Sequence, residues 1–139
     1  MSLFGILKAV VGLGPGIEGC KRDAAAGKAE AQFALGGFYE RGQFGLPQDY
    51  VESAKWYRKA AEQDHHGAQL YLGVYLAQGQ GVRQDFIEGL KWVLLAKRGN
   101  AMDRMAANET QGRLESLMDE LQINQARVMA ALFAAERGE

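Results

Sequence analysis

The sequence predicts an all-α fold built from stacked helical repeats, and three observations carry that prediction. Residues 31–60 and 68–96 repeat each other, with an offset of 37 residues that falls to 36 after a glycine-rich turn. Apolar residues recur with helical spacing along the chain, and no stretch alternates with the period of two that a strand requires. A fixed period of this length is typical of arrays in which each unit buries its apolar side against its neighbours.

Composition is consistent with one domain that has no affinity for nucleic acid. The chain has 139 residues, of which 47% are hydrophobic, enough for a continuous core. Sixteen basic residues oppose seventeen acidic ones, so the net charge of -1 gives no basic surface for DNA or RNA. The single cysteine, Cys20, excludes an intramolecular disulfide and a Cys-rich zinc site. We therefore expect a reducing, cytoplasmic location.

Residues 1–27 are expected to form N-terminal cap helices that cover the open end of the array. The apolar run over residues 3–13 is too short to span a bilayer, and Lys8 lies in its middle, where a secretory signal carries no charge. Cys20 loosely matches a lipid-attachment site, but Glu18 stands where a small residue is needed. A targeting segment, with a periplasmic or envelope-associated location, remains the alternative.

The first repeat is predicted over residues 28–67. Its first helix covers residues 29–41 and stops at Gly42, and the second helix follows a glycine-containing turn. Asp49 stands at the N-cap of that second helix with Glu52 three residues later, which predicts a capping box.

The second repeat is predicted over residues 68–100, where Asp85 and Glu88 repeat the capping box. Residues 101–139 lack the Leu-Gly pair and are expected to form a degenerate repeat and a C-terminal cap. Asp119 and Gln122 predict a third capping box there.

Glycines stand at matching places in the two units. Gly36 and Gly73 lie inside helices, where glycine costs about 1 kcal/mol relative to alanine, so a close crossing of two helices must offset that cost. We expect Trp56 and Trp92 of the paired helices to fill the space beside them. A second set of glycines is expected to supply the dihedral angles of the turns: Gly42, Gly45, Gly79 and Gly81.

The pattern Ala-x-x-x-Leu-Gly-x-x-Tyr-x-x-Gly, followed by a loop, Asp and Ala-x-x-Trp-Tyr-x-x-Ala-Ala, resembles the Sel-1-like repeat, a relative of the tetratricopeptide repeat. The repeat-defining residues of that resemblance are Leu35, Gly36, Tyr39, Gly42, Trp56, Tyr57, Leu72, Gly73, Gly79 and Trp92. The second unit departs from the pattern at Leu76, which replaces a tyrosine, and at Gly89, which replaces an alanine. The resemblance implies a right-handed α-solenoid with helical caps, whose first helices line a concave face that holds another protein.

The positions between the repeat-defining residues of the first helices are the candidates for partner binding. They are Gln32, Phe38, Arg41, Gln69, Tyr71, Tyr75 and Gln78. Aromatic and amide side chains suit an interface. The alternative is that Phe38, Tyr71 and Tyr75 pack between helices, as aromatic residues with helical spacing usually do.

Catalysis has little basis in this sequence. His65 and His66 are adjacent, so on a helix they point about 100° apart and cannot share a metal as an i, i+4 pair can. Their place between two helices suggests an exposed turn. Ser53 and Ser116 have no nucleophile-elbow context. We therefore expect no catalytic residue, no metal and no cofactor.

The leading hypothesis is a non-catalytic bacterial adaptor or regulator that binds a protein or peptide on its concave face. The first alternative is an immunity-type inhibitor that neutralises a secreted toxin or effector, and a hydrolase-like enzyme is a remote alternative. We expect no small-molecule substrate and no membrane association. The oligomeric state stays open, because the ends of a short solenoid could pair.

Overall fold

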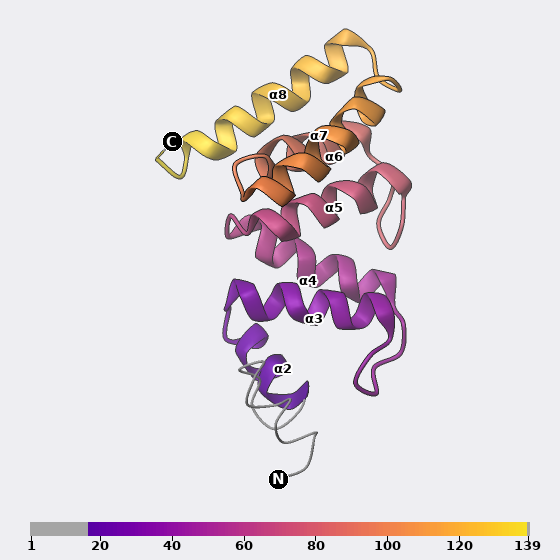
Figure 1. The fold of residues 1–139 in the computed structure, drawn as a ribbon, viewed down its shortest axis with the longest axis vertical. Coiled ribbons are helices and arrows are strands. Elements are labelled where there is room, and N and C mark those ends of the chain that lie inside the picture. The colour runs from indigo at the N-terminus through magenta and orange to yellow at the C-terminus, as the bar shows by residue number, and fades with distance from the viewer. Residues whose placement is uncertain (1–16, 139) are drawn as a thin grey trace.

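The computed structural model describes residues 17–138, and all regular structure in that range is helical. The expected cap helix within residues 1–16, and its alternative as a targeting segment, lie outside the described residues. The seven helices of the described part are α2 (Ile17–Ala25), α3 (Ala29–Arg41), α4 (Tyr50–Glu62), α5 (His66–Gln78), α6 (Phe86–Ala96), α7 (Ala101–Glu115) and α8 (Glu120–Ala135). They stack in chain order from α2 at one end to α8 at the other (Figure 1), which confirms the all-α repeat fold.

The packing of the helices follows the repeat until the last one. Helices α3 and α4 form one antiparallel hairpin and α5 and α6 the next, with α5 packed between α4 and α6. Helix α7 continues the series on α6 and α5. Helix α8, in contrast, packs mainly on α6 rather than on α7 (Figure 1). None of the described helices combines the length and the hydropathy that a membrane-spanning segment needs.

The predicted N-caps are present, but only one of the three capping boxes is complete. The Asp49 carboxylate accepts the amides of Val51 and Glu52, and that of Asp85 accepts the amide of Glu88. The reciprocal bond exists only at Asp119 and Gln122.

At both incomplete boxes the glutamate carboxylate bonds to another side chain instead of the N-cap amide. Glu52 and Glu88 are predicted to reach back to the N-cap amide, but both carboxylates bind other side chains. Glu52 accepts a bond from Lys55 at 3.2 Å, and Glu88 accepts one from Trp92 Nε1 at 3.3 Å.

The turn glycines adopt the predicted left-handed conformation. Gly42 and Gly79 end α3 and α5 with φ of 64° and 67°, and each donates its amide to a carbonyl of the last helical turn. Gly45 and Gly81 have φ of 80° and 69°. A side chain at any of these positions would strain the backbone, so the glycines fix where the two hairpins turn.

Gly36 and Gly73 lie at close helix crossings, as predicted, but tryptophan does not fill the space. A Cβ on Gly36 would lie 2.7 Å from the ring of Tyr57, and a Cβ on Gly73 would lie 2.7 Å from Val93 Cγ2 and 2.9 Å from the carbonyl oxygen of Gly89. Tyr57 and Val93 each follow the predicted tryptophan by one residue. One residue is a rotation of about 100° around the helix, so the indoles point elsewhere.

The two tryptophans therefore differ in environment. Trp92 is 2% exposed and packs edge to face against Phe133 of α8 at 5.1 Å between ring centroids. Trp56 is half-buried, with Lys59 Nζ 4.5 Å above its ring. The prediction that both indoles pack in the core is right for Trp92, whereas Trp56 contacts the buried cluster of Cys20, Ala24 and Leu35 only at its edge and stays partly in solvent.

Candidate functional site

Three of the predicted partner-binding residues are buried, and their side chains cannot reach a partner. Gln32 is 4% exposed, Gln69 is fully buried and Tyr75 is 2% exposed. Each points between helices rather than away from them. The interpretation of these three positions as an interface is therefore wrong.

The two glutamines perform the same structural task in successive repeats. Gln32 Nε2 donates to the carbonyl of Ala24 at 3.1 Å, and Gln69 Nε2 donates to the carbonyl of Ala61 at 3.2 Å. Both carbonyls belong to the last turn of the preceding helix, where they also accept the backbone amides of Gly27 and Asp64 just beyond the helix end. Each glutamine therefore ties the start of a repeat to the end of the previous one.

Tyr75 belongs to a buried polar network that spans the first two repeats. Its hydroxyl donates to Glu40 Oε1 at 2.9 Å and lies 3.0 Å from Ser53 Oγ. The Tyr57 hydroxyl donates to the other oxygen of Glu40 at 3.1 Å. Burial, together with the nearby Glu40 carboxylate, raises the pKa of Tyr57 and Tyr75 far above the usual tyrosine range. Both phenols stay protonated and bind α3 to α4 and α5.

The other four predicted residues reach the surface to different extents. Tyr71 is 41% exposed, whereas Phe38 is half-buried and packs edge to face against Phe44 at 4.7 Å. Arg41 and Gln78 are exposed near the C-terminal ends of α3 and α5. Fewer of the predicted residues can therefore contact a partner than the sequence suggested.

Tyr71 lies at the edge of a polar pocket of about 580 Å³ between the N-terminal ends of α3, α5 and α7. We call it the α3–α5–α7 pocket; its lining residues are Glu30, Phe33, Asp64, His65, His66, Gly67, Tyr71, Asn100 and Asp103. The described lining contains three carboxylates and neither lysine nor arginine. Phe33 packs between Tyr71 at 5.7 Å and His65 at 4.6 Å, so aromatic rings form one wall.

One carboxylate of this pocket is held by the protein itself. Arg98 binds both oxygens of Asp64, at 3.0 and 2.8 Å, and Gln69 donates to Oδ1 at 3.0 Å. Burial by itself would raise the pKa of Asp64, but these hydrogen bonds hold it below its usual value. The Arg98 guanidinium neutralises the charge of the Asp64 carboxylate. The net negative charge of the pocket therefore comes from Glu30 and Asp103.

The sequence suggested that the two histidines lie in an exposed turn, but the structure places them at the start of α5, where both are partly buried. His65 is the N-cap of α5: its Nδ1 accepts the amide of Ala68 at 3.1 Å, which leaves Nε2 to donate to Glu30 Oε2 at 2.8 Å. His66 is half-buried, with Nε2 at 3.8 Å from Asp64 Oδ1. Within residues 17–138, no three His, Cys, Asp or Glu side chains are grouped so that they could hold a metal ion.

The two serines that the sequence analysis set aside as nucleophiles, Ser53 and Ser116, both have structural partners. Ser53 Oγ is fully buried beside the Tyr75 hydroxyl, and Ser116 Oγ donates to the carbonyl of Arg113 at 2.7 Å. Neither geometry activates a hydroxyl group, because neither serine bonds to a general base.

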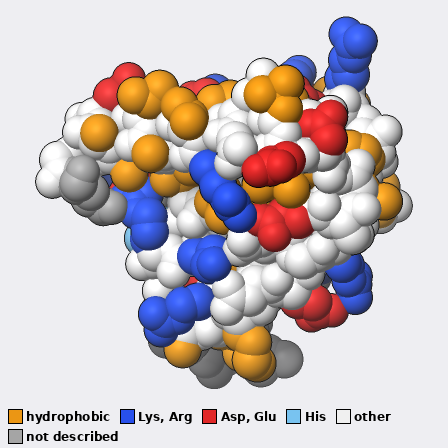
Figure 2. Space-filling view, turned by 90° about the horizontal axis from the view of Figure 1, so that it is seen from above, with side chains coloured by type: hydrophobic (Ala, Val, Ile, Leu, Met, Phe, Trp, Pro, Cys, Tyr) orange, Lys and Arg blue, Asp and Glu red, His pale blue; other side chains and the backbone are white. Residues whose placement is uncertain are grey.

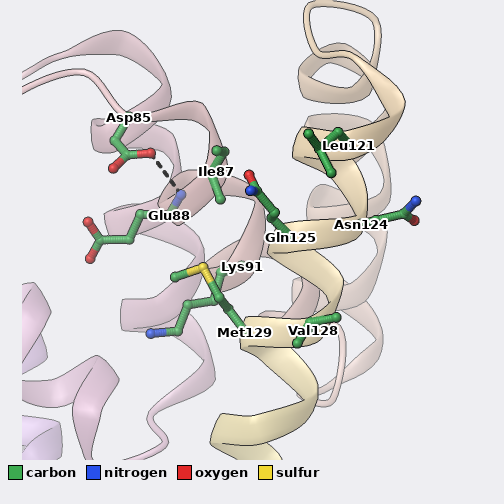
Figure 3. A pocket seen from close by; sticks show the side chains of 9 residues that line it. All are labelled: Asp85, Ile87, Glu88, Lys91, Leu121, Asn124, Gln125, Val128 and Met129. Carbon is green, nitrogen blue, oxygen red and sulfur yellow. Dashed lines mark hydrogen bonds between the residues drawn. The ribbon is translucent and has the colours of Figure 1, made fainter.

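A second surface lies at the α8 end of the molecule, which Figure 2 shows from above, with hydrophobic side chains gathered toward its upper left. A groove of about 700 Å³ runs there between α6 and α8. Its lining residues are Asp85, Ile87, Glu88, Lys91, Leu121, Asn124, Gln125, Val128 and Met129, and Figure 3 shows the α8 side chains along one wall. We call it the α6–α8 groove.

Two charged residues of the groove are partly withdrawn from solvent. Burial would raise the pKa of Glu88, but the ion pair with Arg58 and the bond from Trp92 hold it below its usual value. Lys91 lies 4.2 Å above the Trp92 ring, and burial lowers its pKa. These contacts leave Ile87, Leu121, Val128 and Met129 as the apolar part of the groove.

The sequence interpretation did not include this groove among its candidates. A signal was nevertheless present, because α8 has apolar residues on two sides. Ala126 and Phe133 belong to the buried side, and Leu121 and Val128 to the exposed side. A helix that is apolar on two sides needs two neighbours.

With this geometry established, comparison with known proteins identifies the repeat. The Sel1 repeat family model matches residues 29–65 and 66–100, more than half of the chain. Chitin synthase regulatory factor 3 of Schizosaccharomyces pombe is 43% identical over 63 residues, which are 45% of this chain and 7% of that factor.

Two solved structures have the same arrangement of helices. A protective antigen present in uropathogenic Escherichia coli strains, which displays an SLR fold, is 30% identical with a TM-score of 0.77 and covers 84% of this chain. A Sel1 repeat protein from Oxalobacter formigenes is 31% identical with a TM-score of 0.62, over 67% of this chain and 70% of its own. The chain spans only 24% of the antigen's length.

Proposed function

Because this chain belongs to the Sel1 repeat family, we propose that it is a non-catalytic module that binds another protein on the face formed by α3, α5 and α7. Such repeats generally mediate protein interactions. The fungal relative is a regulatory factor, which supports an adaptor or regulator role for this chain.

The exposed ring of Tyr71 is the observation that carries this proposal. The ring stacks on Tyr57 at 5.3 Å with an interplanar angle of 24°, and it packs against Phe33. Tyr57 is in turn fixed by its hydrogen bond to Glu40. Tyr71 therefore presents a large aromatic surface to solvent from a rigid support, so a partner would lose little side-chain entropy in covering it.

The charge of the α3–α5–α7 pocket defines the partner's chemistry. Glu30, whose side chain is 85% exposed, and Asp103 both supply carboxylates to the same lining as the Phe33 and Tyr71 rings. A lysine or arginine side chain can pair with a carboxylate and lie against an aromatic face at the same time. We therefore expect the partner to insert a basic side chain beside Tyr71.

Site-specific photo-crosslinking tests this proposal. A photoreactive phenylalanine analogue at position 71 should crosslink the partner in cells. The same analogue at Val51, which is 51% exposed on α4, should not. Asp103→Asn should weaken crosslinking at position 71, because it removes one carboxylate of the pocket. Equal crosslinking from positions 71 and 51 would reject the α3–α5–α7 face. One dominant partner at equal stoichiometry would indicate the inhibitor variant of this function.

A further inference from the structure

We propose that the partner of this chain presents an extended segment in which a lysine or arginine and an aliphatic residue lie about three positions apart, and that these two side chains occupy two separate pockets between α5 and α7. The basic side chain enters the α3–α5–α7 pocket, and the aliphatic one enters a second pocket at the other ends of α5 and α7. This inference rests on the proposed function, because it takes Tyr71 as a contact, and it adds the second pocket and the spacing.

The second pocket lies between the C-terminal ends of α5 and α7 and encloses about 230 Å³; we call it the α5–α7 pocket. Its charged lining residue, Arg113, is bound to Glu109 at 2.6 Å. The apolar lining residues are Val74, Ala77, Phe86, Leu114 and Leu117. Because a side chain that enters this pocket loses contact with water mainly against apolar atoms, the α5–α7 pocket suits an aliphatic residue.

Both pockets lie on the same side of α5. Gly67 and Tyr71 line the α3–α5–α7 pocket, and Val74 and Gln78 line the α5–α7 pocket. The steps between these four residues are four, three and four positions, which places them along one side of a helix. A single segment that follows this side of α5 therefore passes both pockets.

Helix α7 joins the two pockets in the same way. Asp103 lines the first pocket, and Thr110 and Leu114 line the second, seven and eleven positions later. Ala106 and Ala107 lie on this side of α7 between them. Helix α5 contains no Asp, Glu, Lys or Arg. The carboxylates thus attract a basic side chain at the first pocket only, which sets the register of the segment.

The distance between the pockets sets the spacing of the two side chains. Tyr71 and Gln78 on α5 are seven residues apart, as are Asp103 and Thr110 on α7, and at about 1.5 Å per residue each pair is separated by about 10 Å along its helix. An extended polyproline-II segment advances about 3.1 Å per residue with three residues per turn. Residues three positions apart therefore lie about 9 Å apart and project to the same side.

The packing of the helices favours an extended segment over a helical one. Helices α5 and α7 contact each other, so the space between them is narrower than a helix, whose diameter with side chains is about 10 Å. A helical partner would rest on the outer side chains of α5 and α7, whereas an extended chain can approach both pockets with its backbone.

Photo-crosslinking at a second position separates this inference from the proposed function. The photoreactive phenylalanine analogue placed at Leu117, which is 65% exposed, should crosslink the same partner as the analogue at position 71. A partner captured from position 71 and not from position 117 would overturn the two-pocket inference and leave the proposed function intact. No capture from position 71 would reject the proposed function and this inference together.

Synthetic peptides test the spacing directly. Short labelled peptides of alanine and proline, each with one lysine and one leucine in either order, are titrated with the full chain by fluorescence anisotropy. In at least one order, a separation of three positions should bind about tenfold more tightly than a separation of two or five, because only then do both side chains reach their pockets. Equal affinity at every separation, no binding in either order, or tighter binding of a helical peptide with the two residues seven positions apart would overturn the proposal.

Two variants assign each peptide side chain to its pocket. Asp103→Asn should reduce the advantage of lysine over alanine in the peptide about threefold, since Glu30 remains, and should leave the advantage of leucine unchanged. Leu117→Ser should reduce the advantage of leucine about threefold and leave that of lysine unchanged. Met105→Ser, at a position that is 71% exposed on the other side of α7, is the matched control and should bind every peptide like the wild type. Variants at positions 103 and 117 that weaken both advantages equally would overturn the assignment of the two pockets.

Discussion

The ring of Tyr57 fills the space where Gly36 has no side chain. A Cβ at position 36 would lie 2.7 Å from two ring carbons of Tyr57, closer than carbon atoms can approach. The ring cannot easily move, because its hydroxyl is bound to Glu40 and its face is stacked on Tyr71. This contact joins α3 to α4 and supports the exposed ring proposed for partner binding.

Gly36→Ala should lower the free energy of unfolding by about 1 to 2 kcal/mol, because the steric cost exceeds the gain in helix propensity. Gly112→Ala is the matched control in α7, where a Cβ would meet nothing within 4 Å. It should raise the free energy of unfolding by about 0.5 to 1 kcal/mol. Urea denaturation measures both, and changes of the same sign would reject the close crossing.

The two tryptophans should respond differently to truncation. Trp92→Ala should cost about 3 to 5 kcal/mol, because the indole is buried against Phe133. Trp56→Ala should cost about 1 to 2 kcal/mol, since that indole is already half in contact with water. Thermal and chemical denaturation of both variants measures the difference. Similar losses would mean that Trp56 is as buried as Trp92.

Stability should fall at alkaline pH through Tyr57 and Tyr75. Their pKa values are raised in the folded chain, so the unfolded chain releases these protons first, above about pH 10. The stabilisation is complete below that pH and is lost as the pH rises. With two protons released only on unfolding, the slope should approach about 2.7 kcal/mol per pH unit.

Denaturation at a series of pH values from about 9 to 12 measures that slope. The double variant Tyr57→Phe, Tyr75→Phe should be less stable at pH 7 but should lose less stability over this range. An equal slope in the double variant would assign the alkaline loss to other groups.

The ion pair between Asp64 and Arg98 should contribute to stability near neutral pH and not in acid. Because the pKa of Asp64 is lowered in the folded chain, its contribution is present above the unfolded value of about 3.9 and disappears as the pH falls below it. Asp64→Asn should cost about 1 to 2 kcal/mol at pH 7, and the difference from the wild type should shrink below pH 4.

Glu109→Gln is the control for that variant. Glu109 pairs with Arg113 on the surface of α7, where the two side chains are 67% and 77% exposed. Such exposed pairs contribute little, so this variant should match the wild type at every pH. A pH-independent loss in Asp64→Asn would show that geometry at position 64, rather than charge, is responsible.

Local features of this protein were predictable from the sequence because they depend on neighbouring residues alone. Gly42 and Gly79 ended their helices as predicted, since only glycine enters the left-handed region without strain. Asp49, Asp85 and Asp119 cap their helices, because a short carboxylate reaches the first free amides. The internal repeat predicted where the helical hairpins lie, and its resemblance to the Sel-1-like repeat predicted the overall fold.

Whether a given side chain points inward depends on more than its neighbours in the chain. Trp56 and Tyr57 are adjacent, and the sequence predicted that Trp56 packs against Gly36. The rotation of α4 about its axis places Tyr57 there instead, and no local sequence pattern defines that rotation. Gln32 and Gln69 resemble surface residues, and only the approach of the preceding helix end shows that they are buried and hydrogen-bonded.

The amino-acid sequence alone determined that this chain is a stack of helical hairpins with glycine turns, because helix periodicity, caps and turn conformations are short-range properties. The tertiary structure decided that Tyr57 fills the space beside Gly36, that Tyr71 remains exposed, and that α8 packs on α6 with an apolar stripe facing water. These features depend on the rotation and offset of each helix against its neighbours, which contacts between distant residues fix.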